Sequence, residues 1–471
     1  MSSKCENIVC NSLIKLSFFV FLIHFFIHGH CYSDIHTPYR VTLAVPVEYS
    51  MSFIGRAFLM ETNQTLPNFR AALSVEALNQ NYSCSLDVLF GDVKVWSSGH
   101  LSPFYTTEKC VLELTQDGDL QLKDKKEQVG WRTGTHGQGV ERLQLLRTGN
   151  LVLVDALNLI KWQSFNFPTN VMLWGQRLDV ATHLTSFPTN STSFYSFEIQ
   201  DNKIALYLNS GKLKYSYWEF KPSKNRNITF VKLGSKGLVI FNDKQRKIAQ
   251  IPSQRHESLQ FLALSNRTGN MGLYYYSPND GKFKSSFQAL NSTCDLPLAC
   301  KPYGICTLSN VCSCIRFVNS DDKLNPGCST EGNPGGFCGE SQAEMLELHG
   351  VTSVLRVNPN KVNVSKDVCA NLCMDDCKCV AALYSSGKEC FLYELVRGVK
   401  QVDRELGMRS SYMVKVPKGT SGGEKKSSGL RKWVLILVGV VDGLIIFLVL
   451  GAIGYYVIWR RRKNSLDTDN T

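Results

Sequence analysis

The chain has 471 residues, of which 44% are hydrophobic and 20% are charged, and its formal net charge is +12. Its 17 cysteines are typical of a disulfide-bonded extracellular protein and argue against a reduced cytosolic one. The basic residues are scattered and form no nucleic-acid-binding motif, so no nucleic-acid partner is expected. The excess of positive charge leaves open an attraction to acidic polysaccharides.

Residues 1–31 have the features of a secretory signal peptide. Lys4 and Lys15 precede a short apolar run, residues 16–27, and the small-residue pattern Gly29-His30-Cys31 follows it. A second membrane span is the weaker alternative, because a spanning helix needs roughly 17 residues or more. We therefore expect the mature chain to fold in an oxidising compartment with its remaining 14 cysteines in disulfides.

Residues 32–180 contain an internal repeat. Seven residues recur at a fixed offset of 31 positions, Leu112, Leu114, Gly118, Leu120, Leu122, Asp124 and Trp131 as Leu143, Leu145, Gly149, Leu151, Leu153, Asp155 and Trp162. Within each copy leucines alternate with polar residues, which predicts strands with one buried face. A looser third copy ends at Trp96. Three such units predict a three-sided β-prism with the tryptophans and leucines inside.

The segment "GNLVLVDALNLIKWQSFNFPTNVMLWGQRL", residues 149–178, resembles the bulb-type lectin domain of plant S-locus glycoproteins and S-domain receptor-like kinases. The resemblance implies that each prism face can hold mannose through the pattern Gln-x-Asp-x-Asn-x-Val-x-Tyr. The second repeat keeps Asp117 of this pattern, and the third keeps Asn150 and Val152. So few matches favour a scaffold that has lost the sugar sites, with binding at these residues as the alternative.

Residues 181–292 resemble a weaker second lectin-like domain. The sequence "RTGN" at residues 147–150 reappears at residues 267–270, again before alternating apolar residues. Its candidate sugar face keeps Asn270 and Tyr274, and a glycan on Asn266 would obstruct that face. Tyr274 is suited either to stacking on a sugar ring or to half-burial on a strand.

Residues 293–330 resemble an EGF-like module of six cysteines. A segment of this size cannot bury enough apolar surface to fold alone, so disulfides are expected to hold it. Sequence alone allows fifteen pairings. The resemblance implies the pairs Cys294 with Cys306, Cys300 with Cys312, and Cys314 with Cys328. The preceding residues lack acidic calcium ligands, and we predict no metal ion.

Residues 338–416 resemble a PAN/apple module, an α+β unit in which a helix packs on a small antiparallel sheet. A second set of six cysteines lies here, Cys338, Cys369, Cys373, Cys377, Cys379 and Cys390. The helix is expected to be N-capped near Ser365. A metal site at some of these thiolates is the weaker alternative to disulfides. Cys84 and Cys110 then remain as a pair in the first lectin-like domain.

Seven N-x-S/T sequons lie between the signal peptide and the membrane span, at Asn63, Asn81, Asn190, Asn227, Asn266, Asn291 and Asn363. In an extracellular domain they predict N-glycosylation.

Residues 434–458 are apolar apart from Asp442 and predict one transmembrane helix, after a juxtamembrane linker at residues 417–433. Basic residues follow at once, which together with the signal peptide predicts a single-pass type I protein of the plasma membrane with residues 459–471 in the cytoplasm. Gly439 and Gly443 form G-x-x-x-G, a surface on which a second helix can approach closely, and a buried Asp442 would need a polar partner. The alternative is a plain anchor.

The order of lectin-like, EGF-like and PAN modules before one span resembles plant S-domain receptor kinases. The sequence after the span contains no kinase motif, Gly419-Thr420-Ser421-Gly422-Gly423 lacks the strand and helix of a nucleophile elbow, and the histidines are scattered. We therefore expect neither catalysis nor a cofactor.

The hypothesis is a kinase-less cell-surface recognition glycoprotein that binds a carbohydrate, peptide or protein ligand. It would act as a co-receptor or decoy for S-domain receptor kinases, or form a homodimer, through its PAN module and transmembrane helix. The alternative is a structural tether between membrane and wall polysaccharide.

Overall fold

The computed structural model describes residues 34–46, 53–64, 67–78, 81–187, 193–222, 227–253, 260–315, 328, 343–403, 410–417 and 428–466. The expected signal peptide, and most of the expected linker, lie outside these residues. The chain divides into two compact units. The first comprises Met1–Ser313, Gly350–Pro359 and Arg397–Gly407, and the second comprises Cys314–His349, Asn360–Val396 and Met408–Thr471.

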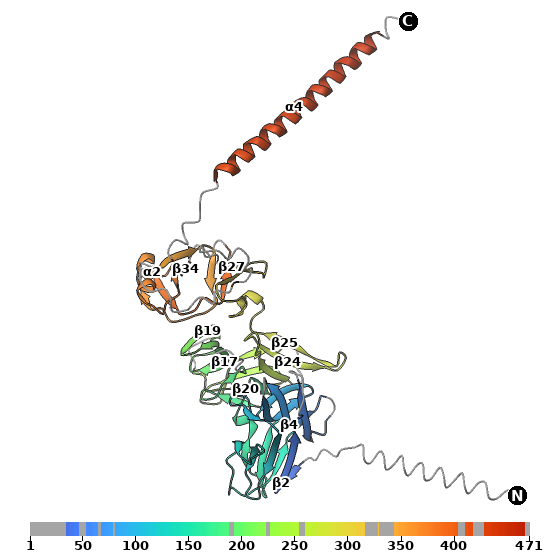
Figure 1. Cartoon of the computed structure of the whole chain (residues 1–471), viewed down its shortest axis with the longest axis vertical. Coiled ribbons are helices and arrows are strands. Elements are labelled where there is room, and N and C mark those ends of the chain that lie inside the picture. Colours follow the sequence, from blue (N-terminus) through green and yellow to red (C-terminus); the bar gives the residue numbers. More distant parts are fainter. Residues whose placement is uncertain are drawn as a thin grey trace, which may run out of the picture. The chain divides into compact units, whose positions relative to one another are not determined.

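The N-terminal half of the first unit is built from three antiparallel sheets (Figure 1, blue to teal). One sheet contains β3 (Ile54–Glu61), β4 (Phe69–Leu78), β5 (Asn81–Phe90) and β6 (Val93–Ser97), with β7 (Phe104–Thr106) beside β5. A second contains β2 (Tyr39–Ala44), β8 (Lys109–Leu114), β9 (Leu120–Lys123) and β10 (Val129–Arg132). The third contains β1 (Asp34–His36), β11 (Val140–Leu145), β12 (Leu151–Asp155) and β13 (Ile160–Gln163). Each sheet corresponds to one copy of the repeat.

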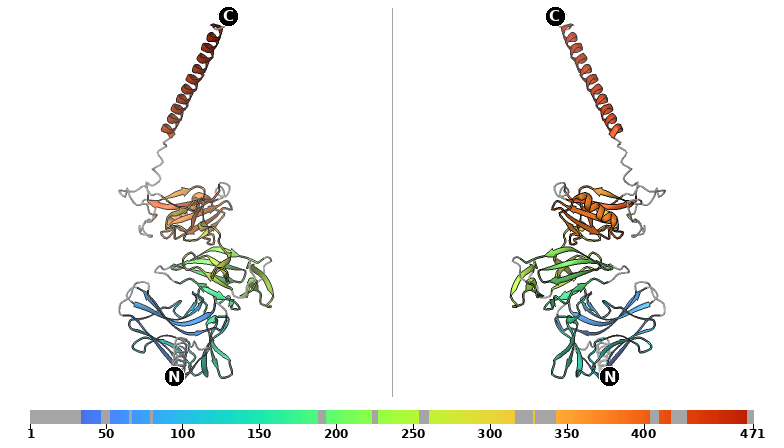
Figure 2. Two further views of the ribbon diagram at one scale, coloured as in Figure 1. Left: turned by 90° about the vertical axis from the view of Figure 1, so that its right-hand side faces the viewer. Right: turned by 90° about the vertical axis from the view of Figure 1, so that its left-hand side faces the viewer.

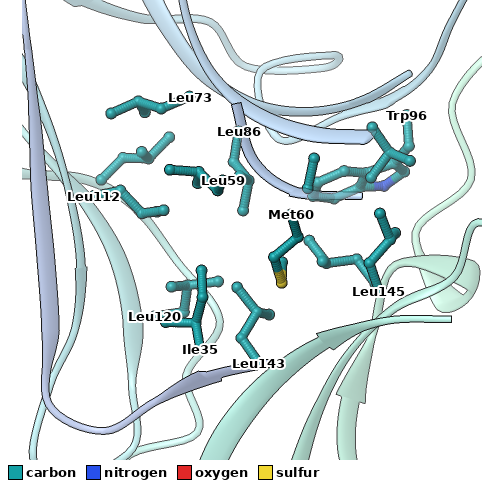
Figure 3. Close-up of a cluster of buried hydrophobic side chains, with 14 of the residues drawn as sticks. Ile35, Leu59, Met60, Leu73, Leu86, Trp96, Leu112, Leu120, Leu143 and Leu145 are labelled. Carbon is teal, nitrogen blue, oxygen red and sulfur yellow. The ribbon is translucent and has the colours of Figure 1, made fainter. Parts of the chain in front are cut away.

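The alternating leucines of all three sheets meet in one core. Figure 3 shows Leu86, Leu112, Leu120 and Leu143 from different strands pointing into the same space. The tryptophans of the repeat also meet, because the rings of Trp96, Trp131 and Trp162 lie 5.8 to 6.3 Å apart in pairwise edge contacts. Edge contacts of this kind add to the stabilisation from burial. The prism with inward leucines and tryptophans is thus observed.

A second group of three sheets follows in the same unit (Figure 2, green to yellow). One sheet contains β14 (Val171–Leu173), β23 (Gln260–Leu264), β24 (Met271–Ser277) and β25 (Lys282–Gln288). Another contains β15 (Arg177–Asp179), β20 (Phe230–Gly234), β21 (Gly237–Phe241) and β22 (Lys247–Pro252). The last contains β16 (Leu184–Thr185), β17 (Ser193–Gln200), β18 (Lys203–Ser210) and β19 (Leu213–Phe220).

The boundary between the two prisms lies earlier than the residue 180 expected from the sequence. After the short 3-10 turn η1 (Ser164–Asn166), the strands β14 and β15 already complete sheets of the second prism. The alternation of apolar and polar residues continues across this region, so the sequence does not reveal which strands β14 and β15 pair with. Phe261 of β23 also packs into the core of the first prism. The two prisms therefore share a packed junction.

The segment expected to be EGF-like contains η2 (Thr293–Asp295), β26 (Gly304–Cys306) and β27 (Cys312–Cys314). β26 pairs in parallel with β33 (Val399–Gln401), which pairs antiparallel with β29 (Val351–Ser353). Lys400 Nζ lies 2.6 Å from Oδ1 of Asp295. Two segments of the expected PAN region thus belong to the first unit.

The second unit holds the helix and sheet expected of the PAN module. The sheet contains β28 (Ala343–Leu348), β34 (Ser410–Pro417), β31 (Ala381–Ser385), β32 (Glu389–Tyr393) and β30 (Lys361–Val362). Helix α2 (Lys366–Asp375) begins after Ser365, whose Oγ accepts a hydrogen bond from the backbone N–H of Val368. At its other end, buried Lys415 donates to the carbonyl oxygens of Met374 and Asp376. Both helix ends are therefore capped by side chains.

The last described element is the long helix α4 (Ser428–Leu466). Within it, residues Gly443–Arg460 have a mean hydropathy of 1.8 and none of that stretch is buried. It is the one helix in the described part of the chain that is long and apolar enough to cross a membrane. This agrees with the transmembrane helix predicted at residues 434–458.

Candidate functional site

The sheet of the second repeat, which contains β2, β8, β9 and β10, does not bring its predicted sugar ligands together. Asp117 is exposed on the turn between β8 and β9, with Oδ2 3.5 Å from Nδ1 of His136. The long side chains of this sheet pair with one another instead, because Glu113 Oε2 lies 3.0 Å from Arg40 Nη1 and 2.5 Å from Lys123 Nζ. The polar groups that would face a sugar on this sheet already have partners.

On the sheet of the third repeat, which contains β1, β11, β12 and β13, the predicted sugar ligands are buried in contacts within the protein. Asn150 is buried, and its Oδ1 accepts hydrogen bonds from the backbone N–H of Phe165 and from Ser164 Oγ, each at 3.2 Å. Its Nδ2 donates to Gln163 Oε1 at 2.8 Å. Val152 is also buried. Asn150 therefore fixes the segment that follows β13, and it leaves no free amide for a sugar hydroxyl.

The equivalent residue of the second repeat and a residue of the second prism have the same role as Asn150. Asp119, one repeat before Asn150, is buried and accepts hydrogen bonds from the backbone N–H groups of Gly134 and Thr135, at 2.8 and 3.1 Å. Asn270 in the second prism accepts from the backbone N–H of Leu290 at 3.0 Å and donates to its carbonyl at 2.8 Å. These three side chains therefore hold backbone segments in place, and their polar atoms are used within the protein.

Tyr274 of β24 is half-buried on the second prism. Its ring stacks on Phe261 with 5.2 Å between ring centroids, and Gln288 Nε2 donates to its hydroxyl at 3.3 Å. The predicted residues Asp117, Asn150, Val152, Asn270 and Tyr274 are therefore not brought together, and each is placed by contacts within its own sheet or junction.

A pocket that was not predicted from the sequence lies on the sheet formed by β3 to β7, the first face of the first prism. Its cavity has a volume of about 110 Å³. Glu76 of β4, Ser83 and Ser85 of β5 and Lys94 of β6 contribute polar groups, and Phe187 closes another side. The alternation of Ser83, Ser85 and Asp87 along β5 was the available signal, but the first copy of the repeat is loose and Phe187 is remote in sequence.

A charged trio holds one end of this pocket. Lys94 forms ion pairs with Glu76 and with Asp87, whose Oδ2 lies 3.1 Å from Nζ. Asp87 is fully buried. Burial lowers the pKa of Lys94, but the two carboxylates outweigh it and the pKa is raised above its ordinary value. Lys94 therefore stays charged at neutral pH.

The opposite wall of the pocket is held rigidly at the junction of the prisms. The ring of Phe187 lies edge-on to His100, with 5.1 Å between ring centroids. The backbone N–H of Phe187 donates to Asn266 Oδ1 at 2.8 Å. His100 is buried, and Nε2 lies 2.7 Å from the carbonyl oxygen of Thr185. Burial lowers the pKa of His100, so it is neutral and donates that hydrogen bond.

The four disulfide pairs expected from the sequence are present, and two further pairs lie in the PAN-like segment, for which no pairing was predicted. Cys84 is bonded to Cys110 in the first prism. In the EGF-like segment the bonded pairs are Cys294–Cys306, Cys300–Cys312 and Cys314–Cys328. In the second unit they are Cys369–Cys390 and Cys373–Cys379. Cys377 is also disulfide-bonded, whereas Cys338 lies outside the described residues. Among the described residues, no three His, Cys, Asp or Glu side chains are placed to hold a metal ion.

The asparagines of six sequons are exposed, as N-glycosylation requires: Asn63, Asn81, Asn227, Asn266, Asn291 and Asn363. Asn190 lies outside the described residues. In α4, Gly443 has open space around it. Gly439 and Asp442 lie within the helix, but their surroundings are outside what the structure describes.

Comparison with known proteins defines the class of this protein. Residues 94–194 match the family model for D-mannose binding lectins, and residues 345–412 match that for PAN-like domains. The chain thus carries a lectin-type domain and a PAN-like domain, followed by a candidate transmembrane helix. A solved monomeric monocot mannose-binding lectin from Gastrodia elata is 24% identical over 19% of this chain and 82% of that chain, with a TM-score of 0.15.

Its relatives are receptor-like proteins of plants. A PAN domain-containing protein of Arabidopsis thaliana is 26% identical over 75% of this chain and 73% of its own length. The G-type lectin S-receptor-like serine/threonine-protein kinase SD2-5 of the same plant is 23% identical over 79% of this chain. The chain spans about half the length of such kinase relatives. These relatives confirm the resemblance to the S-domain receptors.

Proposed function

We propose that this chain is a non-catalytic cell-surface recognition glycoprotein. Its ectodomain binds a carbohydrate, peptide or protein ligand, and it acts as a co-receptor or decoy for receptor kinases that carry the same extracellular modules. One observation carries the proposal: a lectin-type and a PAN-like domain precede a single apolar helix, and the kinases of the S-receptor-like group match most of this chain with only part of their own length.

The proposal places the protein in the plasma membrane with its prisms outside and the residues after α4 in the cytoplasm. The disulfides and the exposed sequon asparagines support an extracellular position for residues 32–416. In this proposal the signal comes from a partner kinase that carries the same extracellular modules.

The PAN-like domain is the region where we expect the partner to bind, together with α4. Capping at both ends of α2 and the disulfides Cys369–Cys390 and Cys373–Cys379 make this domain a rigid surface. A rigid surface loses little conformational entropy on binding.

The test is affinity purification of the full chain from native plant membranes after mild cross-linking. We expect S-receptor-like kinases to be enriched over a control chain in which residues 343–417 are replaced by a PAN domain of unrelated sequence. Equal recovery of kinases with both chains, or no kinase with either, would contradict the proposal.

The alternative function is a tether to wall polysaccharide, and the net charge favours it. The leader contributes +1 and residues 424–471 contribute +4 to the total of +12, which leaves +7 for the ectodomain. Retention on pectin that falls steeply with added salt, without enrichment of any kinase, would favour the tether.

A further inference from the structure

The pocket on the first prism face has the size of a single ring. Its volume is about 110 Å³, and an apolar protein cavity of about 150 Å³ is known to hold benzene. The pocket is partly open to solvent, so a six-membered ring can enter it while the rest of the ligand stays outside. A full saccharide chain or a folded peptide segment cannot enter.

Most of the wall is apolar. The apolar part of the lining comes from Ala77, Pro103, Phe187 and Cys84, which is bonded to Cys110. An aromatic ring fits such a wall because it loses no hydrogen bonds with water on entering. A pyranose would bring several hydroxyls into the cavity; Ser83, Ser85 and Ser97 can pair with some of them, but each hydroxyl left against the apolar lining without a partner costs about 1–3 kcal/mol.

The polar end of the pocket selects a hydroxyl. The carboxylate of Glu76 accepts hydrogen bonds and the ammonium of Lys94 donates them. Lys94 and Arg56, whose Nη2 lies 4.0 Å from Oε1 of Glu76, together balance the charges of Glu76 and Asp87. A hydroxyl both donates and accepts, so one oxygen can pair with both groups. A charged ligand group would instead compete with one member of the ion pair, and Asp87 behind Lys94 keeps that pair in place.

We propose that this pocket binds a phenol: the ring lies between Phe187 and the Cys84–Cys110 disulfide, and its hydroxyl pairs with Glu76 and Lys94. The proposed site identifies the chemical class of the ligand for the recognition function proposed above, and this inference rests on that function. The phenol comes either from a tyrosine side chain of a polypeptide ligand or from a free small phenolic compound.

The probes are N-acetyl-L-tyrosinamide, N-acetyl-L-phenylalaninamide and p-cresol, with the full chain in detergent micelles and binding measured by saturation-transfer NMR. We expect the tyrosine derivative to bind at least tenfold more tightly than the phenylalanine derivative. Tighter binding of the tyrosine derivative than of p-cresol assigns the ligand to a polypeptide, and the reverse assigns it to a small phenolic compound.

Gly99→Leu is the blocking variant. Gly99 lines the pocket, and a Cβ there would lie 3.5 Å from Ser85 Cβ and 3.8 Å from Pro103 Cα, which are ordinary contacts, so we expect the backbone to accept a side chain that fills the cavity. We expect it to abolish phenol binding while its thermal unfolding matches that of the parent chain. Asp117→Asn, on the exposed turn of the second face, is the matched control and should leave binding unchanged.

Equal binding of the tyrosine and phenylalanine derivatives, or unchanged binding in Gly99→Leu, would overturn the phenol site. So would binding of methyl α-mannoside that Gly99→Leu abolishes while p-cresol does not bind. Enrichment of receptor kinases by the full chain is measured separately, so the recognition function can stand when the phenol site fails.

Discussion

Nζ of Lys94 lies 3.1 Å from Oδ2 of Asp87, a residue with 0% of its surface exposed. A buried carboxylate is costly to leave without its counter-ion, and breaking such a pair costs about 3–5 kcal/mol. We expect Lys94→Met to lower the free energy of unfolding of the first prism by about 3 kcal/mol. Tryptophan fluorescence during unfolding measures it, because Trp96, Trp131 and Trp162 lie in that core.

The double variant Lys94→Met with Asp87→Leu separates loss of the ion pair from loss of packing. Removing both charges should restore most of the stability, since an apolar replacement of a buried pair is often neutral. Lys125→Met is the exposed control, where the ion pair with Glu108 is worth about 0–1 kcal/mol. A double variant as unstable as the single one would contradict this reading of the pair.

Gly149 and Gly134 make a matched pair for testing the repeat turn. Both have positive φ, +81° and +72°. A Cβ at Gly149 would lie 2.5 Å from Phe69 and 2.8 Å from Leu173, whereas one at Gly134 meets nothing within 4 Å. We expect Gly134→Ala to cost about 1 kcal/mol for the backbone conformation alone.

Gly149→Ala should cost about 2–4 kcal/mol, because overpacking adds to the same backbone cost. Urea unfolding of both variants measures the difference. Equal costs would mean that the core moves aside without strain and that close packing does not require glycine at this turn.

The hydrogen-bonded carboxylate of Asp119 is expected to lower the free energy of unfolding in acid. Burial raises the pKa of this carboxyl, but hydrogen bonds from Gln121, Thr133 and the backbone of Gly134 and Thr135 outweigh it, and the pKa is lowered. A carboxyl with a lowered pKa stabilises the fold fully above its unfolded value of about 3.9, and the contribution is lost as the pH falls through the folded pKa.

Asp119→Asn tests this with the residue found at the equivalent positions Asn150 and Asn270. The amide oxygen can keep accepting the backbone hydrogen bonds, so we expect a cost of about 1 kcal/mol at pH 7. The acid-dependent part of the unfolding free energy assigned to Asp119 should disappear. Unfolding curves between pH 7 and pH 2 that fall equally steeply for parent and variant would exclude Asp119 as a source of acid sensitivity.

These residues show which features of the fold and of the candidate site could be predicted from the sequence. Strands β8, β9, β11 and β12 follow from alternation, because a sheet with one buried face imposes that period. The role of Asn150 could not be predicted, since a motif does not reveal whether an amide faces solvent or a backbone N–H. The first-face pocket was missed because Glu76, Lys94 and Phe187 converge only after the prisms pack together.

Asp442 is the residue for testing whether α4 is more than an anchor. A carboxylate within an apolar helix costs on the order of 3 kcal/mol for insertion, which a polar group on a partner helix would relieve. We expect Asp442→Leu to weaken recovery of the partner kinase at least fivefold after detergent solubilisation, while the amount of chain at the cell surface stays the same. Surface biotinylation and co-immunoprecipitation measure the two quantities.

Leu444→Ile is the matched control, because it changes the shape of an apolar residue two positions away and leaves the charge in place. It should alter neither quantity. Unchanged recovery of the kinase with Asp442→Leu would reduce α4 to an anchor and move the whole partner interface to the ectodomain. Lower surface delivery without lower recovery per delivered chain would place the role of Asp442 in trafficking rather than in helix association.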